Sequence, residues 1–473
     1  APANGFNASA NAGYGSYDSW KTDLSMQGAK GKWNYTAGYS FFDTKGINET
    51  INLNNSPLSD KDGYRQQNVQ AGLGTKFGDL IKSQLFFRYG KMEGSIDQGA
   101  YLDELDYTYT QRSTQAGIRN EGNFKNSKVN LLYQYNKVYR TYIDDSVKSR
   151  NGFDTWSKGQ YEGGEHMIDL YANYTFKNGM RLLAGADLRR YSTEQFYQSI
   201  PAYGPLTVLD TISTQKDVYA HFYLSDRKRF QVELGGRLNF HSAYGSQAVY
   251  TINPSWSFGK GNKVFANISS SYRTPSLYQL YSEYGNASLD PEYGKSMEAG
   301  VQLSALNKKI TTRLVAYKRN TREGIFFYFD PVTYVASYIN QDRQKDHGLE
   351  WEINYTPSQK LSLRLHYNYV TGKIQTKENG KDTSYNNLLR RPEHQSAIST
   401  SWKAAKQWLV SGSVSYNGKR KDAWFNSANF STERVTLPSY ILVNIYLEYK
   451  FLKLPIGLFA DGRNLTGTDY MEI

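Results

Sequence analysis

The sequence contains no cysteine, which excludes disulfide bonds, thiolate metal ligands and a cysteine nucleophile. It also lacks any apolar run of the ~18 residues that a membrane-spanning helix requires, which excludes a helical inner-membrane protein. Dense blocks of Lys or Arg are absent although the net charge is +12, and such evenly spread charge argues against a nucleic-acid partner. No His-x-x-x-His pair or nucleophile motif occurs, so we expect no enzyme.

Aromatic residues and glycine are abundant instead. Tyr, Phe and Trp make up 15% of the 473 residues, there are 40 glycines, and the hydrophobic fraction is only 39%. This composition is typical of a large β-structure whose strands carry one apolar and one polar face.

Period-two alternation confirms that expectation in several segments, the clearest at residues 168–176, 231–240, 361–369 and 441–451. These strands are ten residues or longer, close to the ~9–11 residues that a tilted strand needs to cross a bilayer. We therefore expect the apolar set to face lipid and the charged set to face a lumen. The lipid set is Ile168, Leu170, Val232, Leu234, Leu363, Leu365, Val443 and Ile445, and the lumen set is Asp169, Glu233, Arg237, Arg364, His366 and Glu448.

Short polar turns alternate with long segments that read as irregular loops. The long segments are 44–63, 91–106, 139–163, 193–213, 273–293, 320–344, 371–391 and 417–437. Short turns at one rim and long loops at the other are typical of an outer-membrane barrel.

Counting between these connections gives 21 strands, from the first near Gly5–Gly13 to the last near residues 456–465. All-antiparallel closure requires an even number. We therefore predict an all-β, transmembrane antiparallel β-barrel of the 22-strand type with 21 strands in this chain. A β-propeller would show an internal repeat of ~40–50 residues, and none is found.

Four motifs resemble those of the TonB-dependent outer-membrane transporter family. Residues 271–292 read Ser-Tyr-Arg-Thr-Pro-Ser-Leu-Tyr-Gln-Leu-Tyr-Ser-Glu-Tyr-Gly-Asn-Ala-Ser-Leu-Asp-Pro-Glu, similar to the family's aromatic-x-x-Pro and Gly-Asn-x-x-Leu-x-Pro-Glu stretch. Gly348-Leu349-Glu350, Arg390-Arg391-Pro392 and the near-terminal Asn464-Leu465-Thr466-Gly467-Thr468-Asp469-Tyr470 follow in the family's order, with Thr466 where the family has Phe.

The resemblance implies an importer in the outer membrane of a Gram-negative bacterium, driven by the TonB energy-coupling complex. Residues 1–473 would be its barrel domain, without the family's N-terminal plug and final strand. Outer-membrane lipid, including lipopolysaccharide, and a surface lipoprotein are further expected partners. The alternative from a different class is a passive porin or structural barrel, although porins usually need only 16–18 strands.

Within the family, the Leu277–Glu292 stretch is closest to the cobalamin (vitamin B12) receptor branch, and a ferric siderophore or haem is the alternative ligand. Because a large, partly apolar ligand stacks on aromatic rings, we expect it to bind Tyr278, Tyr281 and Tyr284, together with Asn286. Further loop aromatics are candidates, with the bilayer aromatic girdle as the competing interpretation: Tyr197, Tyr203, Phe326, Phe327, Tyr328, Phe329 and Tyr334.

Acidic residues cluster in the long loops, namely Asp60, Asp62, Asp97, Asp103, Glu104, Asp106, Asp144 and Asp145. Calcium binds six to eight hard oxygens, which such carboxylates supply. The cobalamin branch uses calcium to order its loops, and Asp103 and Asp106 lie in the corresponding loop. Solvated loop charges are the favoured interpretation of these residues, and calcium bound by Asp103 and Asp106 is the alternative.

Overall fold

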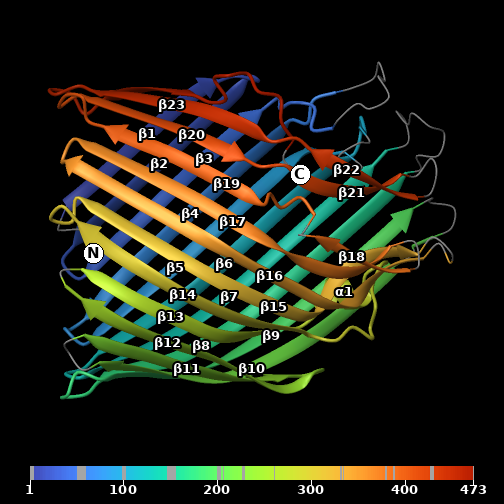
Figure 1. Ribbon diagram of the computed structural model, residues 1–473, viewed down its shortest axis with the longest axis horizontal. Helices are drawn as coiled ribbons and strands as arrows, with labels where there is room; N and C mark the ends of the chain where they lie inside the picture. The colour runs from blue at the N-terminus through green and yellow to red at the C-terminus, as the bar shows by residue number, and fades with distance from the viewer. Residues whose placement is uncertain are drawn as a thin grey trace. The chain divides into compact units, whose positions relative to one another are not determined.

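The computed structural model describes residues 5–50, 60–97, 103–145, 156–199, 204–205, 207–225, 229–259, 261–330, 333, 335–378, 381–386, 389–426 and 431–471. Nearly all of these residues lie in antiparallel strands, and 22 strands form one sheet (Figure 1). Among the described residues, no helix has the length and apolar character needed to cross a membrane.

The chain divides into two compact units. The first comprises residues 1–221, 237–248 and 276–287, and the second comprises 222–236, 249–275 and 288–473. The strands that lie in the first unit, with the one short helix, are β1 (Gly5–Gly15), β2 (Ser19–Lys30), β3 (Trp33–Thr44), β4 (Tyr64–Phe77), β5 (Ile81–Ser95), β6 (Thr108–Asn123), β7 (Ser127–Asp144), β8 (Ser157–Thr175), β9 (Arg181–Ser199) and α1 (Leu277–Tyr281).

Three strands have residues in both units: β10 (Thr207–Ser225), β11 (Phe230–His241) and β12 (Gly245–Phe258). The second unit holds β13 (Asn262–Arg273), β14 (Glu292–Ala305), β15 (Ile310–Asp330), β16 (Val335–Ser358), β17 (Leu361–Glu378), β18 (Lys381–Asn386), β19 (His394–Trp402), β20 (Trp408–Asn417), β21 (Arg420–Asn426), β22 (Ser431–Leu437), β23 (Tyr440–Lys450) and β24 (Gly457–Gly462).

The pairing of β17 explains how 22 strands in the sheet correspond to 21 strands in the wall. Strand β17 pairs with β19 from Leu361 to Tyr369 and with the short β18 from Lys373 to Glu378. Strand β18 is therefore the return of a hairpin within a loop, and the pair β21–β22 forms a separate two-stranded sheet. The remaining 21 strands confirm the number expected from the sequence.

Apolar side chains lie on the outside of the sheet. Across β4 to β9, one register row places Leu73, Leu85, Ile118, Tyr133, Ile168 and Leu188 opposite one another on one face. All of these except Ile118 are among the large apolar side chains that remain exposed, whereas few apolar side chains are buried. Such a distribution is unfavourable in water and suits a lipid solvent.

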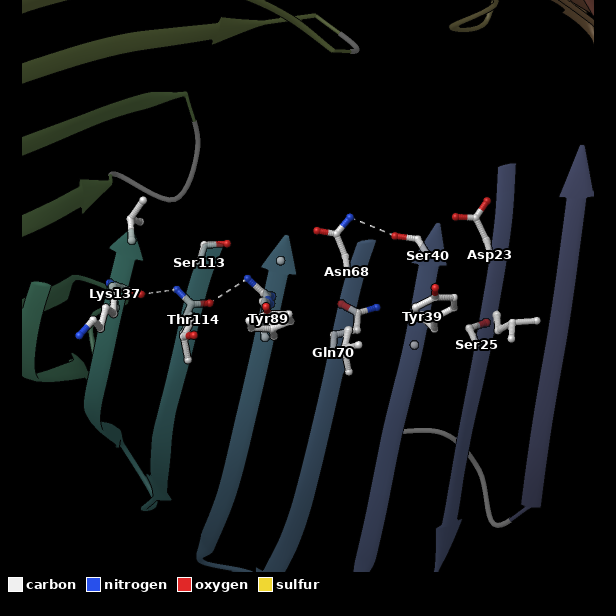
Figure 2. A pocket seen from close by; sticks show the side chains of 18 residues that line it. Asp23, Ser25, Tyr39, Ser40, Asn68, Gln70, Tyr89, Ser113, Thr114 and Lys137 are labelled. Atoms are coloured by element: carbon white, nitrogen blue, oxygen red, sulfur yellow. Dashed lines mark hydrogen bonds between the residues drawn. The ribbon is translucent and has the colours of Figure 1, made fainter. Parts of the chain in front are cut away.

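The opposite face carries polar side chains that bond along the sheet. Figure 2 shows this face of β2 to β7, where Asn68 Nδ2 donates to Ser40 Oγ over 3.2 Å. In the next row of this polar face, Arg88 donates to Gln115 Oε1 (3.1 Å), Gln115 to Asn136 Oδ1 (2.9 Å), and Asn136 to Glu165 Oε2 (2.7 Å). Small residues in these rows leave a shallow basin of about 640 Å³.

Adjacent residues of the two predicted sets lie on opposite faces. Ile168 is exposed on the apolar face, while Asp169 accepts a hydrogen bond from Tyr219 on the polar face over 2.6 Å. Arg237 bonds the buried Asp187 on that same polar face. For these residues the alternation in the sequence assigned the faces correctly.

The expectation of irregular long loops was wrong for several segments. Strands β15 and β16 are 21 and 24 residues long and pair up to Asp330 and Val335. Residues 371–391 and 417–437 likewise contain β18, β21 and β22. The ladder continues into water because cross-strand hydrogen bonds do not need an apolar face, and period-two patterning is lost where both faces are wet.

We expect the two faces to tolerate charge very differently. Val414 in β20 is 46% exposed and pairs with Ile398 and Val443, whereas the next residue, Ser415, pairs with Ala397 and Leu442 on the polar face. Val414→Arg should lower the free energy of unfolding from bilayers by about 2–4 kcal/mol, and Ser415→Arg by less than about 1 kcal/mol. Urea titration in liposomes measures both, and equal losses would contradict the assignment of faces.

Candidate functional site

The loop after β13 is ordered by a short capped helix. Ser276 is the N-cap of α1: its hydroxyl accepts from the Gln279 amide (3.1 Å), and Gln279 Oε1 accepts from the Ser276 amide (3.0 Å). Leu280 anchors the helix with a buried side chain. At Gly285 the chain turns back so closely that a Cβ would lie 2.7 Å from the Leu280 carbonyl oxygen, which only glycine permits.

The α1 loop and the wall strands of the first unit enclose a cavity of about 630 Å³. Tyrosines from separate segments meet there. The rings of Tyr161 and Tyr278 are 5.6 Å apart edge to face, and those of Tyr142 and Tyr161 are 6.0 Å apart. The full lining is Tyr107, Val138, Arg140, Tyr142, Ser157, Gly159, Tyr161, Glu162, Gly163, Thr193, Gln195, Tyr197, Tyr278, Glu283 and Tyr284.

Glu283 is the polar centre of this cavity. Its Oε1 accepts hydrogen bonds from the hydroxyls of Tyr161 (2.9 Å) and Tyr278 (3.3 Å). Its Oε2 is buried without a hydrogen-bond partner among the described residues. Burial, helped by the charge of Asp144, raises the pKa of Tyr107 to about 12, so this lining hydroxyl stays a neutral donor. The cavity therefore offers aromatic faces, hydroxyl donors and one carboxylate oxygen to which no described residue donates.

The structure brings only part of the predicted ligand set together. Tyr278, Tyr284 and the further candidate Tyr197 line the cavity. Tyr281 is 39% exposed and does not line it, and the Asn286 amide donates to the Gln279 carbonyl (2.9 Å) instead. Of the other aromatic candidates, Phe326, Phe327, Tyr328 and Phe329 lie in β15, and Tyr203 and Tyr334 lie outside the described residues.

Sequence reasoning missed Tyr161 and Glu283, the central pair. They are 122 residues apart in the chain, and nothing in the local pattern of β8 distinguishes Tyr161 from a girdle tyrosine. The loop position of Glu283, between two predicted ligand tyrosines, was the one available signal.

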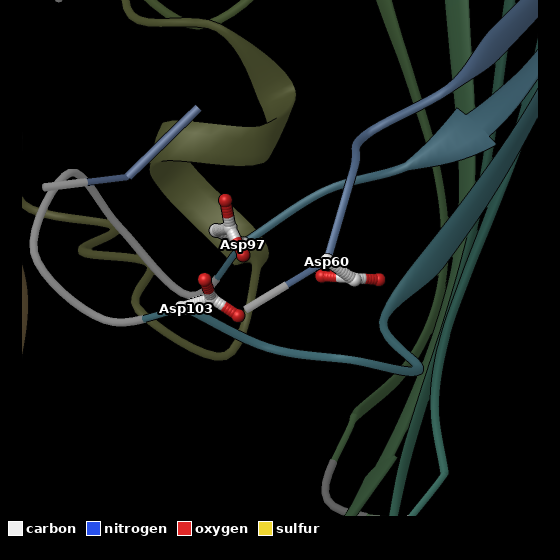
Figure 3. Close-up of side chains that lie close together, drawn as sticks. All are labelled: Asp60, Asp97 and Asp103. Atoms are coloured by element: carbon white, nitrogen blue, oxygen red, sulfur yellow. The ribbon is translucent and has the colours of Figure 1, made fainter. Parts of the chain in front are cut away.

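A cluster of carboxylates lies in the loops of the same unit (Figure 3). Carboxylate oxygens of Asp60, Asp97 and Asp103 lie within 4.8 Å of one another. The side chains of Asn48 and Thr50 both donate to Asp103 Oδ2, and the Glu104 amide donates to Asp97 Oδ1 over 2.7 Å.

The two predicted metal ligands fall into different clusters. Asp103 belongs to the cluster just described, whereas Asp106 lies with Glu104 and Asp144, again within 4.8 Å. Asp103 and Asp106 are only three residues apart, but the chain leaves the first cluster between them on its way to β6.

The first cluster fits a hard divalent cation. Asp62 is only 4% exposed, and its Oδ1 has no hydrogen-bond partner among the described residues. Burial, together with the charges of Asp62, Asp103 and Asp60, raises the pKa of Asp97 to about 7, against the opposing hydrogen bond from the Glu104 amide. Converging carboxylates are the donor set that calcium prefers.

Residues 2–465 match the family model described as TonB dependent receptor-like, beta-barrel. The chain belongs to the TonB-dependent receptor family. It is therefore an antiparallel β-barrel transporter of the Gram-negative outer membrane, not an enzyme, and such receptors work with TonB.

Solved structures of this fold agree at low sequence identity. The siderophore receptor PirA from Acinetobacter baumannii is 16% identical, with a TM-score of 0.75 over 95% of this chain and 74% of that one. The ferric enterobactin receptor PfeA from Pseudomonas aeruginosa is 14% identical, with a TM-score of 0.76 over 98% and 74%. The ferric-catecholate import receptor Fiu from E. coli is also 14% identical, with a TM-score of 0.77 over 99% and 78%.

Loop stability of this receptor should fall as pH rises. The folded-state pKa of Asp97 is above its unfolded value, so the folded loops bind an extra proton between about pH 4 and 7 and lose that stabilisation as the proton leaves. With a chelator present, we expect the rate of limited proteolysis of wild type, divided by the rate for Asp97→Asn, to rise severalfold between pH 5 and pH 7.5.

Asp79→Asn, in the exposed turn between β4 and β5, is the matched control and should follow wild type at every pH. A ratio between wild type and Asp97→Asn that stays constant with pH would show that the carboxylate cluster does not strain the loops.

Proposed function

We propose that this receptor captures cobalamin at the α1 cavity for energy-coupled uptake. The observation that carries the proposal is the Glu283 carboxylate among tyrosines, whose buried Oε2 has no donor within the described part of the chain. A corrin ring with peripheral amides supplies N–H donors to that oxygen and a broad surface for the aromatic rings. Because an unsatisfied buried acceptor costs free energy, such a donor stabilises the complex beyond its contact area.

The net charge of the ligand distinguishes cobalamin from the ferric catecholates that similar structures bind. Glu162 and Glu283 line the cavity together with Arg140, and Glu162 is paired with Lys137 over 2.5 Å, while the carboxylate clusters place further negative charge in the loops of the same unit. A trianionic ferric complex would meet like charges, which opposes its entry. An uncharged or cationic ligand avoids that repulsion.

The ligand is tested with the purified receptor and a panel of cyanocobalamin, ferric enterobactin and haem. Wild type should bind cyanocobalamin most tightly, and Glu283→Gln, which replaces the acceptor Oε2 by a donor, should weaken that binding by at least ~10-fold. Glu298→Gln in β14, a residue that does not line the cavity, is the matched control and should bind as wild type does.

One result of the ligand panel would contradict the cobalamin proposal. If ferric enterobactin binds most tightly, and Glu283→Gln strengthens its binding by relieving repulsion, the cobalamin proposal fails and a siderophore receptor replaces it. The change in affinity therefore has opposite signs for the two ligand classes.

Calcium is a second part of the proposal. The Asp60, Asp97 and Asp103 cluster would hold the ion, with Asp62 beside it, and the bound charge would neutralise the loops that frame the cavity. No residue of the wall is required for this role.

Isothermal titration at pH 7.5 should show calcium binding that Asp97→Asn and Asp103→Asn each weaken by at least ~10-fold, because each removes a charged ligand. Asp79→Asn should leave it unchanged. Absence of binding at millimolar calcium would leave the cluster as solvated loop charge.

A further inference from the structure

A second cavity, of about 570 Å³, lies in the other unit where β17 changes partner. Pairing of β17 with β19 ends at Tyr369–His394, and pairing with β18 begins at Lys373–Asn386. Between these points the Val370 amide bonds the Glu393 carbonyl (3.0 Å), outside any ladder. The cavity therefore occupies a break in the wall at the long-loop rim.

The lining of this cavity is strongly basic. Glu393 is the one acidic residue among the side chains that line it, whereas five are basic: Lys373, Arg391, Lys419, Arg420 and Lys421. Lys373, Lys419 and Lys421 are exposed, and the structure gives none of them a carboxylate partner among the described residues.

Arg420 adds a buried charge for which the described residues provide no counter-ion. It is 6% exposed, its guanidinium donates to the Met471 carbonyl (2.7 Å) and lies 5.1 Å from the Tyr440 ring centre, and its Nε has no hydrogen-bond partner among the described residues. Its neighbours Arg390 and Arg391 differ, since they pair with Asp422 and Asp346. A buried cation without an anion is costly, so a bound anion would compensate it.

The strand that lines the cavity places it on the outside of the wall. Leu365 pairs with Ile398, which is 53% exposed, and Tyr367 pairs with Trp351, which is 39% exposed. Along β17, Thr371 and Lys373 alternate in step with Leu365 and Tyr367 and so point to the same face. Val370 and Ile374 point to the opposite face and are buried. The basic lining of β17 thus faces the membrane side, not the polar face.

An aromatic cluster fixes the height of the cavity in the bilayer. Tyr367 OH lies 2.9 Å from His394 Nδ1, and the Tyr369 ring is 5.1 Å from the His394 ring. Such residues mark the interface between hydrocarbon and headgroups. Thr371 lies two residues beyond Tyr369, about 7 Å along the strand, which matches the ~5–8 Å depth of a headgroup layer.

The same arrangement recurs in the first unit. Tyr133 OH lies 3.1 Å from His166 Nδ1, the Tyr135 ring is 4.8 Å from the His166 ring, and the exposed Arg190 pairs with His166 across β8 and β9. Aromatic anchors with cations beside them are therefore a repeated feature of the outer face.

We propose that the basic cavity at the partner change in β17 binds a phosphate group on the headgroup of an outer-leaflet lipid. Lys373, Lys419 and Lys421 contact the phosphate, Arg420 supplies buried positive charge behind it, and the acyl chains extend past Tyr367 and Tyr369 along the apolar wall. The lipid then closes the break that the change of strand partner leaves.

The test uses delipidated receptor in a phosphate-free detergent and three probes: bisphosphorylated lipid A, its dephosphorylated form, and inorganic pyrophosphate. Native mass spectrometry measures binding to wild type and to Lys373→Gln/Lys419→Gln/Lys421→Gln. Bisphosphorylated lipid A should bind wild type at least ~10-fold more tightly than it binds the triple variant, and at least ~10-fold more tightly than the dephosphorylated lipid binds wild type.

The matched control is Lys309→Gln/Lys360→Gln/Lys403→Gln, which removes the same charge from exposed turns of the same unit. It should keep the wild-type affinity, and an equal loss there would overturn the site in favour of non-specific attraction. Pyrophosphate that binds as tightly as the lipid would overturn the lipid as the source. If the triple variant fails the heat-modifiability test of a folded barrel, Lys419→Gln replaces it, with an expected loss of about fivefold.

Discussion

Backbone hydrogen bonding in a solvent that offers none is the constraint on which this structure depends. A strand in lipid must satisfy every amide and carbonyl through its neighbours, so 22 of the described strands form one antiparallel sheet. Once the ladder is fixed, alternate side chains face opposite solvents. The many exposed apolar residues and the hydrogen-bonded polar rows, such as Arg88 to Glu165, are two consequences of that single requirement.

The same ladder also builds the sites. Strands β7, β8 and β9 are 18 and 19 residues long, well beyond the ~9–11 that cross a bilayer, and their upper ends carry Tyr142, Tyr161 and Tyr197. The α1 loop adds Glu283 to these rigid ends. Where β17 changes its partner from β19 to β18, basic side chains gather beside the break. Function thus concentrates where strands extend past the membrane or exchange neighbours.

The strands of the wall could be predicted from the sequence because the alternation within each strand reflects the different surroundings of its two faces. The alternation from Ile168 to Phe176 needs no knowledge of other strands, and the turns between hairpins fix the strand number. Contacts between distant segments have no such local pattern and could not be predicted. The Tyr161–Glu283 hydrogen bond, for example, joins residues 122 positions apart. The separation of Asp103 from Asp106 and the helix at Leu277–Tyr281 also depend on packing that period-two patterning does not encode.

The most direct test of the account is a scan of single cysteines along β17 in liposomes, which the absence of native cysteine makes clean. Spin labels at residues 361–369 would report collision with membrane-soluble oxygen and with a water-soluble nickel chelate. Oxygen accessibility should peak at Leu363, Leu365 and Tyr367, and nickel accessibility at Ser362, Arg364 and His366. A profile with no period of two, or with the two sets exchanged, would contradict the assignment of faces from which the wall and both sites are derived.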